Sequence, residues 1–211
     1  MAVLDGVDWV VFDLGETLVD ETSSWGLWAD YLGVPRLTFF AVLGATIARG
    51  GDHLDTHRWF RPDFDLVRDG AAKAAAGLPW GFTEADLYPD ALPALTALRA
   101  AGHRLAVMGN QPVEATPFLA TLPVDRIATS AEWGVAKPDP AFFARVLTEL
   151  SAVPSAVAYV GDRVDNDVLP ARAAGMVSVF LQRGPWGHLH ARLPEAAQAH
   201  LRITSLTELC T

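Results

Sequence analysis

A single apolar stretch that ends in a carboxylate constrains this chain more than any other feature. Residues 10–20 read VVFDLGETLVD, so an apolar run stops at Asp13 and a short loop follows. A few apolar, β-branched residues closed by a glycine-containing loop are typical of a buried strand in a parallel sheet. We therefore predict a strand at residues 8–13. Asp13 would then stand at the carboxyl end of the strand, where open α/β sheets bind ligands. The alternative is that Asp13 only caps the following turn.

The chain beyond residue 87 alternates between helix and strand patterns. We predict helices at residues 90–101, 113–121, 140–150 and 167–174, strands at 103–108, 126–129, 156–160 and 177–182, and a small strand with a helical turn at 203–209. Strands that alternate with helices of this length form a parallel sheet. The predicted fold class is therefore α/β, with a doubly wound, Rossmann-like parallel sheet.

Residues 20–86 follow a different pattern. They show helical stretches, at about 23–32, 35–48, 52–60 and 64–76, and no alternating strand pattern. The aromatic residues of this region are better explained as its core than as a stacking surface. We predict an all-helical domain at residues 20–86, inserted after the first strand of a core that comprises residues 1–19 and 87–211.

Charge and composition exclude several classes of partner. The 211 residues carry a net charge of −9, which argues against nucleic acid and against an anionic membrane surface as partners. No apolar run reaches the roughly 20 residues of a membrane span, and the first residues do not resemble a signal peptide. Cys210 is the only cysteine, so no internal disulfide can form. A cytoplasmic protein is expected, and the sequence does not indicate its oligomeric state.

Four loops near the carboxyl ends of predicted strands carry the polar residues of interest. They contain Asp13, then Gly109 and Asn110, then Lys137, then residues 161–167. In a parallel sheet these loops converge on one crevice. Clustered carboxylate oxygens suit Mg²⁺, which binds one or two protein carboxylates and keeps waters for a substrate phosphate. An aspartate can be the nucleophile of an aspartyl-phosphate mechanism, and a lysine can neutralise the phosphoryl group.

These loops resemble the four signatures of the haloacid dehalogenase (HAD) superfamily. The first signature resembles residues 13–18 (DLGETL), the second the strand that ends in Met108, Gly109 and Asn110, and the third residues 137–140 (KPDP). The fourth resembles residues 161–167 and their continuation to Met176. All four occur in order, so the resemblance spans the whole core. The helical segment at residues 20–86 is similar to the family's helical cap.

The resemblance implies a hydrolase of small phosphorylated metabolites and a role for each site residue. Asp13 would attack the phosphorus, and Lys137 would steady the nucleophile and the phosphoryl group. Asp13, the carbonyl of Gly15 and Asp162 would hold Mg²⁺, with Asp167 close behind. Two simpler readings stay open, in which Asp167 only caps its helix and Lys137 is a solvated loop residue. The expected substrate-binding residues are Thr17, Gly109, Asn110 and Lys137.

Two positions depart from the family pattern. Phosphatases of the family usually carry a second Asp two residues after the nucleophile, as the acid and base of the reaction, and here that residue is Gly15. The second signature usually ends in Ser or Thr, and here it ends in Gly109. General acid–base catalysis contributes about 10²–10⁴ in rate, so the missing carboxylate matters most for a poor leaving group. Glu16 is a candidate substitute, and the alternative is that Glu16 is a solvated loop carboxylate.

Three other functions stay open. The first is carbon–halogen cleavage, because a halide leaves without a proton, although the family's dehalogenases need no metal-binding carboxylates such as Asp162 and Asp167. The second is carbon–phosphorus cleavage, which uses a cap lysine; only Lys73 could serve, and it is expected on an exposed helix face. The third is a binding or regulatory protein that keeps the pocket but has lost turnover.

Overall fold

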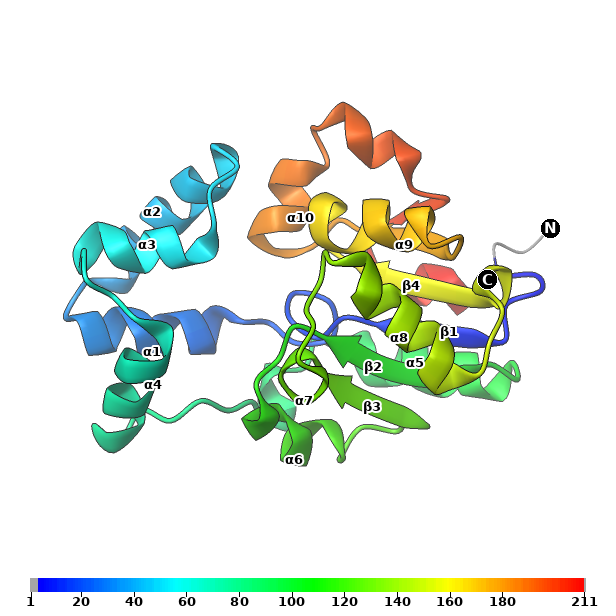
Figure 1. The fold of residues 1–211 in the computed structure, drawn as a ribbon, viewed down its shortest axis with the longest axis horizontal. Coiled ribbons are helices and arrows are strands. Elements are labelled where there is room, and N and C mark those ends of the chain that lie inside the picture. Colours follow the sequence, from blue (N-terminus) through cyan, green and yellow to red (C-terminus); the bar gives the residue numbers. More distant parts are fainter. Residues whose placement is uncertain (1–3, 211) are drawn as a thin grey trace. The chain divides into compact units, whose positions relative to one another are not determined.

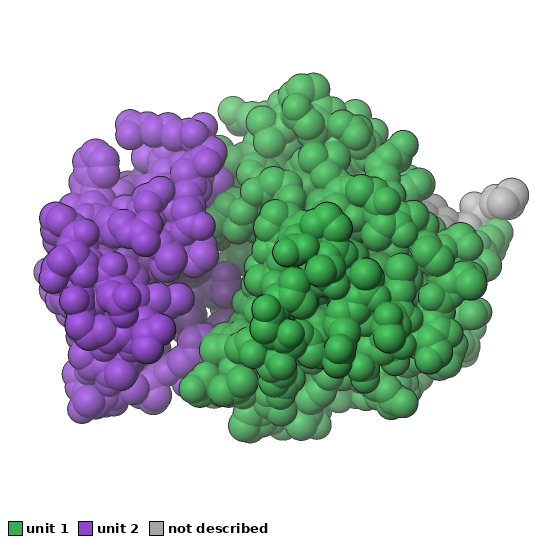
Figure 2. Space-filling model, viewed as in Figure 1, with its two compact units in different colours: residues 1–20, 83–211 green, residues 21–82 purple. Residues whose placement is uncertain are grey.

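The computed structural model describes residues 4–210 of the chain. The described residues form two compact units, which Figure 2 shows in different colours. One unit contains the segments 1–20 and 83–211, and the other contains Glu21–Phe82. The sequence analysis placed these boundaries at residues 19/20 and 86/87.

The larger unit is built on a six-stranded parallel sheet with the strand order β3-β2-β1-β4-β5-β6. The predicted doubly wound α/β fold is therefore confirmed. β1 has both β2 and β4 as hydrogen-bonded neighbours and is buried along its whole length, which explains its uninterrupted apolar sequence. The strands are β1 Trp9–Phe12, β2 Arg104–Gly109, β3 Arg126–Thr129, β4 Val157–Gly161, β5 Val177–Leu181 and β6 Leu201–Ile203.

The strand register brings the ends of the three central strands to one level. Phe12 of β1 pairs with Val107 of β2 and with Val160 of β4. Asp13 therefore follows β1 at the same edge of the sheet at which β2 and β4 end. The loops after these strands share that edge because all three strands run parallel.

Helices cover both faces of the sheet. In Figure 1, α8 and α9 lie in front of the strands and α5 lies behind them. The buried side chains of α8 recur on one face of the helix. They pack with Val11 and Tyr159 of the sheet in one apolar cluster. The helices of this unit are α5 Ala91–Ala100, α6 Thr116–Leu119, α7 Ser130–Trp133, α8 Pro140–Leu150, α9 Leu169–Ala173 and α10 Gly184–His190.

Two predicted helices are shorter than expected, and a proline explains each. The segment predicted as a helix at residues 113–121 forms a 3₁₀ turn, Val113–Ala115, followed by the four-residue α6 around Pro117. The segment predicted at 167–174 begins with a π-helical turn, Val164–Val168, before α9 starts next to Pro170. Proline lacks an N–H and is best tolerated in the first turn of a helix, so a helix restarts at it. Two further short helices, α7 and α10, were not predicted from the sequence.

The smaller unit contains four helices and an aromatic core. They are α1 Thr22–Leu32, α2 Arg36–Ala48, α3 His53–Phe60 and α4 Leu66–Ala75. Lys73 of α4 is 4% exposed, and its ammonium donates to the carbonyl of Leu78 at 2.6 Å. The expectation that Lys73 lies on an exposed helix face is therefore wrong. Within residues 4–210, no single helix is long and apolar enough to cross a membrane, although the bent pair of α1 and α2 meets the same length and composition test.

A histidine at the centre of this aromatic core makes the stability of the protein sensitive to pH. His57 is 1% exposed, stacks on Phe64 at 4.4 Å and meets Trp28 edge-on at 5.0 Å. Burial lowers the pKa of His57 from 6.5 to about 4. The folded state thus favours the neutral ring, so the stabilisation is complete above pH 6.5 and is lost as the pH falls toward 4.

Because of this histidine, we expect the free energy of unfolding to be about 2 kcal/mol lower at pH 5 than at pH 7. That loss corresponds to a drop of roughly 4–8 °C in Tm for a protein of this size. The variant His57→Phe keeps an aromatic ring among Trp28 and Phe64 but cannot titrate. Between pH 7 and pH 5, the Tm of this variant should therefore fall by roughly 4–8 °C less than the Tm of the wild type. His188 is exposed, so the control variant His188→Gln should show the same pH dependence of Tm as the wild type. Equal pH dependence in wild type and His57→Phe would contradict the assignment.

Candidate active site

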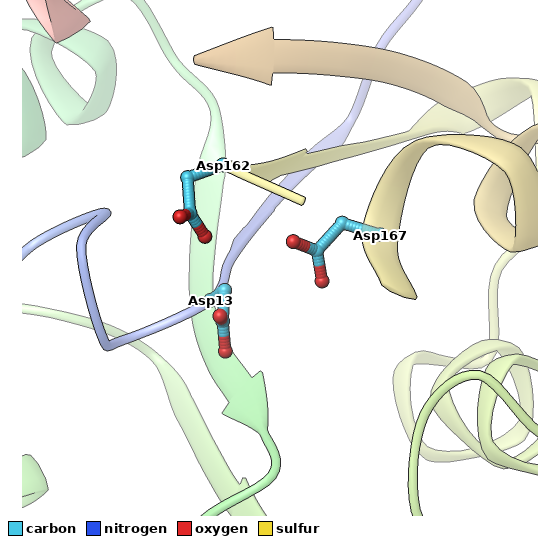
Figure 3. Close-up of side chains that lie close together, drawn as sticks. All are labelled: Asp13, Asp162 and Asp167. Carbon is cyan, nitrogen blue, oxygen red and sulfur yellow. The ribbon is translucent and has the colours of Figure 1, made fainter. Parts of the chain in front are cut away.

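Three carboxylates meet at the carboxyl edge of the sheet. Asp13 follows β1, Asp162 follows β4, and Asp167 lies in the π-helical turn beyond it (Figure 3). All three are buried, and one carboxylate oxygen of each lies within 4.8 Å of the others. The structure thus brings together three residues that the sequence analysis took from two separate loops.

Lys137 lies between two of these carboxylates. Its ammonium is 2.8 Å from Oδ1 of Asp13 and 2.6 Å from Oδ1 of Asp167, and its side chain is fully buried. Burial alone would lower the pKa of Lys137, but the charges of Asp13 and Asp167 raise it well above its usual value. Lys137 is therefore a fixed cation of the site, and the alternative of a solvated loop lysine is wrong.

The cluster has the charge and the donor atoms of a divalent-cation site. Three carboxylates and one ammonium, fully ionised, sum to −3 + 1 = −2. Burial raises the pKa of Asp167 to about 6, and the Asp13 carboxylate adds to the rise while Lys137 opposes it. Buried like charges destabilise one another unless a cation compensates them. Hard carboxylate oxygens with this excess of negative charge suit Mg²⁺.

Because Gly109 has no side chain, the Asp13 carboxylate can lie next to its Cα. A Cβ atom added at Gly109 would collide with Oδ1 of Asp13, and it would lie 3.7 Å from the ammonium of Lys137. The Ser or Thr usual at this position would therefore require another orientation of Asp13. The glycine at residue 109, where the family usually has Ser or Thr, is therefore linked to the position of the Asp13 carboxylate. It is more than the loss of a hydroxyl group.

Asn110 holds the backbone of the loop that carries Lys137. Its side-chain nitrogen donates to the carbonyl of Lys137 at 2.9 Å, and its side-chain oxygen accepts from the backbone N–H of Lys137 at 2.8 Å. Both ends of the amide are engaged in this contact. The loop after β2 and the loop that carries Lys137 are thereby joined at the edge of the sheet.

The loop after Asp13 is a tight turn that places Glu16 in an unusual backbone conformation. The backbone N–H of Thr17 donates to the carbonyl of Leu14 at 3.2 Å, and Thr17 is fully buried. Glu16 has a φ of 50°, in the left-handed region, which costs a residue other than glycine of order 1 kcal/mol. Such backbone strain persists only where the surroundings enforce it.

The surroundings of Glu16 come from Tyr88 and from the loop after β5. Glu16 is 4% exposed, and its carboxylate accepts a hydrogen bond of 2.5 Å from the hydroxyl of Tyr88. Burial and the Glu16 carboxylate raise the pKa of Tyr88 above its usual value, so Tyr88 remains a donor. Gly184 has a φ of 65°, and a Cβ there would lie 2.5 Å from Glu16, so the loop after β5 needs glycine at this position. The alternative of a solvated Glu16 is wrong.

Arg183 ties this loop to the rest of the unit. Its guanidinium donates to the carbonyl of Thr17 at 2.9 Å and pairs with Asp90 at 2.5 Å. It also lies over the ring of Tyr88, 4.1 Å from the centroid. No local sequence signal marks these contacts of Tyr88 and Arg183, because they join residues 72 and 166 positions apart in the chain.

Comparison with known proteins identifies the family. Residues 7–175 match the model of the haloacid dehalogenase-like hydrolases. The chain belongs to this family of hydrolases. Its membership agrees with the sheet order, with the carboxylate cluster and with the resemblance found in the sequence. Among solved structures, the HAD-like β-phosphoglucomutase of Clostridium difficile matches with a TM-score of 0.67 and 17% identity, over 96% of this chain and 93% of that one, which shows the common fold.

Several curated relatives of this HAD-like chain are named as phosphatases. A glyceraldehyde 3-phosphate phosphatase of Methanopyrus kandleri is 36% identical over 110 residues, which are 50% of this chain and 47% of the relative. A phosphoserine phosphatase of Thermus thermophilus is 33% identical over 128 residues, which are 58% of this chain and 49% of the relative. The matched region thus spans about half the length of the curated relatives.

Proposed function

We propose that this HAD-like protein is a Mg²⁺-dependent phosphatase that hydrolyses a small phosphorylated metabolite through an aspartyl-phosphate on Asp13. The observation that carries the proposal is the buried cluster of Asp13, Asp162, Asp167 and Lys137. The names of the curated relatives, which act on phosphate esters of small molecules, support the substrate class. The four-helix unit Glu21–Phe82 takes the part of the family's cap in this proposal.

The reaction begins with attack by a carboxylate oxygen of Asp13 on the phosphorus. The bond between phosphorus and the ester oxygen breaks, and the leaving oxygen needs a proton unless it is already a stable anion. Lys137 holds Asp13 in place and neutralises charge on the phosphoryl oxygens. Water then attacks the phosphorus of the aspartyl-phosphate, which releases inorganic phosphate and restores Asp13.

Asp13, Asp162, Asp167 and the carbonyl of Gly15 would hold Mg²⁺, which would supply positive charge against the phosphoryl group and the carboxylates. Lys137, whose ammonium pairs with Asp167 at 2.6 Å, is a buried positive charge that the chain itself supplies to the site. Gly109 and Asn110 would contribute backbone N–H groups to phosphate binding. Thr17 would contribute its buried hydroxyl, because its backbone N–H donates to the carbonyl of Leu14. This assignment follows from their place at the end of β2 and in the loops after β1 and β2.

Glu16 is the proposed proton-transfer residue of the site. Gly15 has no side chain, so it cannot supply the acid and base that phosphatases of the family usually carry there. Glu16 is the residue after Gly15 and carries the nearest carboxylate along the chain. It accepts a hydrogen bond from the hydroxyl of Tyr88, which can donate a proton. Its strained backbone, with φ 50°, is consistent with a function that the surrounding residues enforce.

The dependence on the leaving group tests this role. We expect Glu16→Gln to lower kcat/KM by about 10²–10⁴ for ethyl phosphate, whose alkoxide needs a proton. For p-nitrophenyl phosphate, whose leaving group is stable as an anion, the loss should be within about tenfold. Glu114→Gln, at an exposed glutamate, provides the matched control. Equal losses for both substrates would assign Glu16 a structural role and not proton transfer.

A second candidate function is a phosphate-binding protein that has lost turnover, and Gly15 is the observation that favours it. Such a protein would bind inorganic phosphate with Mg²⁺ and hydrolyse none of a broad panel of phosphate esters. Carbon–phosphorus cleavage has less support, because Lys73 is buried and its ammonium is engaged with the carbonyl of Leu78. Carbon–halogen cleavage has less support because of the two further carboxylates, Asp162 and Asp167.

A further inference from the structure

Arg163 is held in place at the carboxyl edge of the sheet, directly after Asp162 of the carboxylate cluster. Its backbone N–H donates to Oδ2 of Asp167 at 3.0 Å. Its guanidinium lies over the ring of Trp186, 5.0 Å from the centroid, within the range of a cation–π contact. The side chain is 26% exposed. Arg163 therefore presents a partly accessible, fixed positive charge beside the proposed metal site.

The start of α10 joins Arg163 to the first loop of the site. Trp186, which contacts the guanidinium, is the third residue of this helix. Gly184 is its first residue, and a Cβ atom there would lie 2.5 Å from the side chain of Glu16. Arg163 and Glu16 therefore both contact the first turn of α10, at the edge of the sheet that carries Asp13.

The guanidinium of Arg163 has two edges that can bind a carboxylate, and Asp165 occupies one of them. Nε donates to Oδ1 of Asp165 at 3.2 Å, and Nη2 donates to Oδ2 at 2.8 Å. The other edge consists of Nη1 and the second N–H of Nη2. Within residues 4–210, no side chain or carbonyl accepts a hydrogen bond from Nη1. Because an arginine edge matches the two oxygens of a carboxylate, this open edge is a preformed anion-binding group.

We propose that Arg163 determines substrate specificity by binding a carboxylate of the phosphorylated substrate through its open edge. The inference rests on the proposed phosphatase function and names its substrate class, the phosphate esters of small hydroxy acids. A carboxylate brings one negative charge to a site that already holds three carboxylates, whereas a second phosphate group would bring up to two. The bidentate pair with Asp165 is an example of the same recognition on the opposite edge of the guanidinium.

The simpler reading is that Arg163 only pairs with Asp165 and braces the loop after β4. Asp165 is 58% exposed, and ion pairs with an exposed partner contribute little to stability. The two readings differ in which substrates are affected when the guanidinium is removed. A bracing residue acts through the positions of Asp162 and Asp167, and so on every phosphate ester. A carboxylate-binding residue acts only on esters that carry a carboxylate.

Matched pairs of substrates separate these readings. Phosphoglycolate and ethyl phosphate form the short pair, and 3-phosphoglycerate and glycerol 3-phosphate form the longer pair. The members of each pair share a chain length and differ in the carboxylate. Arg163→Met keeps an apolar stem against Trp186 and removes the charge, while Arg163→Lys keeps the charge and removes the fork. Arg145→Met is the control, because Arg145 is an exposed arginine that also lies over a tryptophan, Trp133, at 5.7 Å.

In at least one pair, we expect the wild type to prefer the carboxylated member by roughly 10- to 10²-fold in kcat/KM, the range of hydrogen bonds between charged groups. Arg163→Met should abolish this preference, mainly through KM, and change kcat/KM for the uncharged member by less than about threefold. Arg163→Lys should retain part of the preference, and Arg145→Met all of it. A wild type without preference in either pair, or equal losses for both members in Arg163→Met, would overturn the inference.

A binding measurement separates this inference from the proposed function. If the wild type hydrolyses none of the four esters, the proposed function fails, and calorimetric titration of phosphoglycolate and 3-phosphoglycerate with Mg²⁺ still decides the inference. Binding of either acid that is at least about tenfold weaker in Arg163→Met supports it, and equal affinities overturn it. If the wild type hydrolyses the esters without preferring a carboxylate, the inference fails and the proposed function stands.

Discussion

Replacing Asp13 with asparagine is expected to lower phosphatase turnover by at least about 10⁴-fold, the loss typical of removing a nucleophile. Asparagine has nearly the same shape, but its amide cannot form the aspartyl-phosphate. The variant should remain folded, because Lys137 keeps Asp167 at 2.6 Å as a partner and the repulsion between buried carboxylates decreases. We therefore expect its Tm to stay within a few degrees of the wild-type value.

A second aspartate on a nearby loop provides the control for this substitution. Asp139 follows Lys137 by two residues, is exposed, and caps α8 through a hydrogen bond of 2.8 Å from the backbone N–H of Ala141. Asparagine caps helices about as well as aspartate, so Asp139→Asn should keep both Tm and turnover within about twofold. Turnover by Asp13→Asn at more than a tenth of the wild-type rate would exclude Asp13 as the nucleophile.

Replacing Gly15 with aspartate in the Glu16→Gln background is expected to raise kcat/KM for ethyl phosphate by about 10²-fold, the lower end of the contribution of general acid–base catalysis. The added carboxylate would protonate the alkoxide and then activate the attacking water. Gly15 is not among the glycines with positive φ, so its backbone can accept a side chain. The gain for p-nitrophenyl phosphate should be smaller than about tenfold, because that leaving group needs no proton.

Gly15→Asn separates proton transfer from the filling of space, because it adds the same volume and cannot act as an acid. In the Glu16→Gln background, the rate with Gly15→Asn should not exceed that of Glu16→Gln alone. If Gly15→Asp is no faster than Gly15→Asn in this background on ethyl phosphate, the missing carboxylate does not limit the reaction, and a residue outside the first loop carries the proton. If the wild type is inactive and Gly15→Asp gains turnover, the protein is a phosphate-binding member of the family.

The parts of the site that sequence could predict are those encoded by short local patterns. β1 is recognisable because a central parallel strand must be apolar on both faces, and a glycine-containing loop follows Asp13. The loops with Lys137 and Asp162 follow in chain order, and the parallel topology then places them at one edge of the sheet. Their convergence therefore follows once the strands are identified.

The features that sequence could not predict depend on contacts between distant segments. Glu16 was singled out from the sequence, yet its contacts with Tyr88 and Gly184 could not be predicted, because both residues lie far along the chain. The burial of Lys73 was missed for a similar reason: its ammonium meets carbonyl groups beyond the end of α4. The helix at residues 113–121 was overextended because its apolar pattern continues through Pro117, where the backbone cannot form a regular helix.

The central claim is that Asp13 carries the phosphoryl group during turnover, and trapping that intermediate tests it most directly. Enzyme with Mg²⁺ and a ³²P-labelled phosphate ester would be quenched in acid within the first turnover, and the labelled peptide identified by proteolysis and mass spectrometry. We predict label on the peptide that contains Asp13, with none in Asp13→Asn and none when a chelator removes the metal. Label on another residue, or steady turnover without any labelled peptide, would contradict the account.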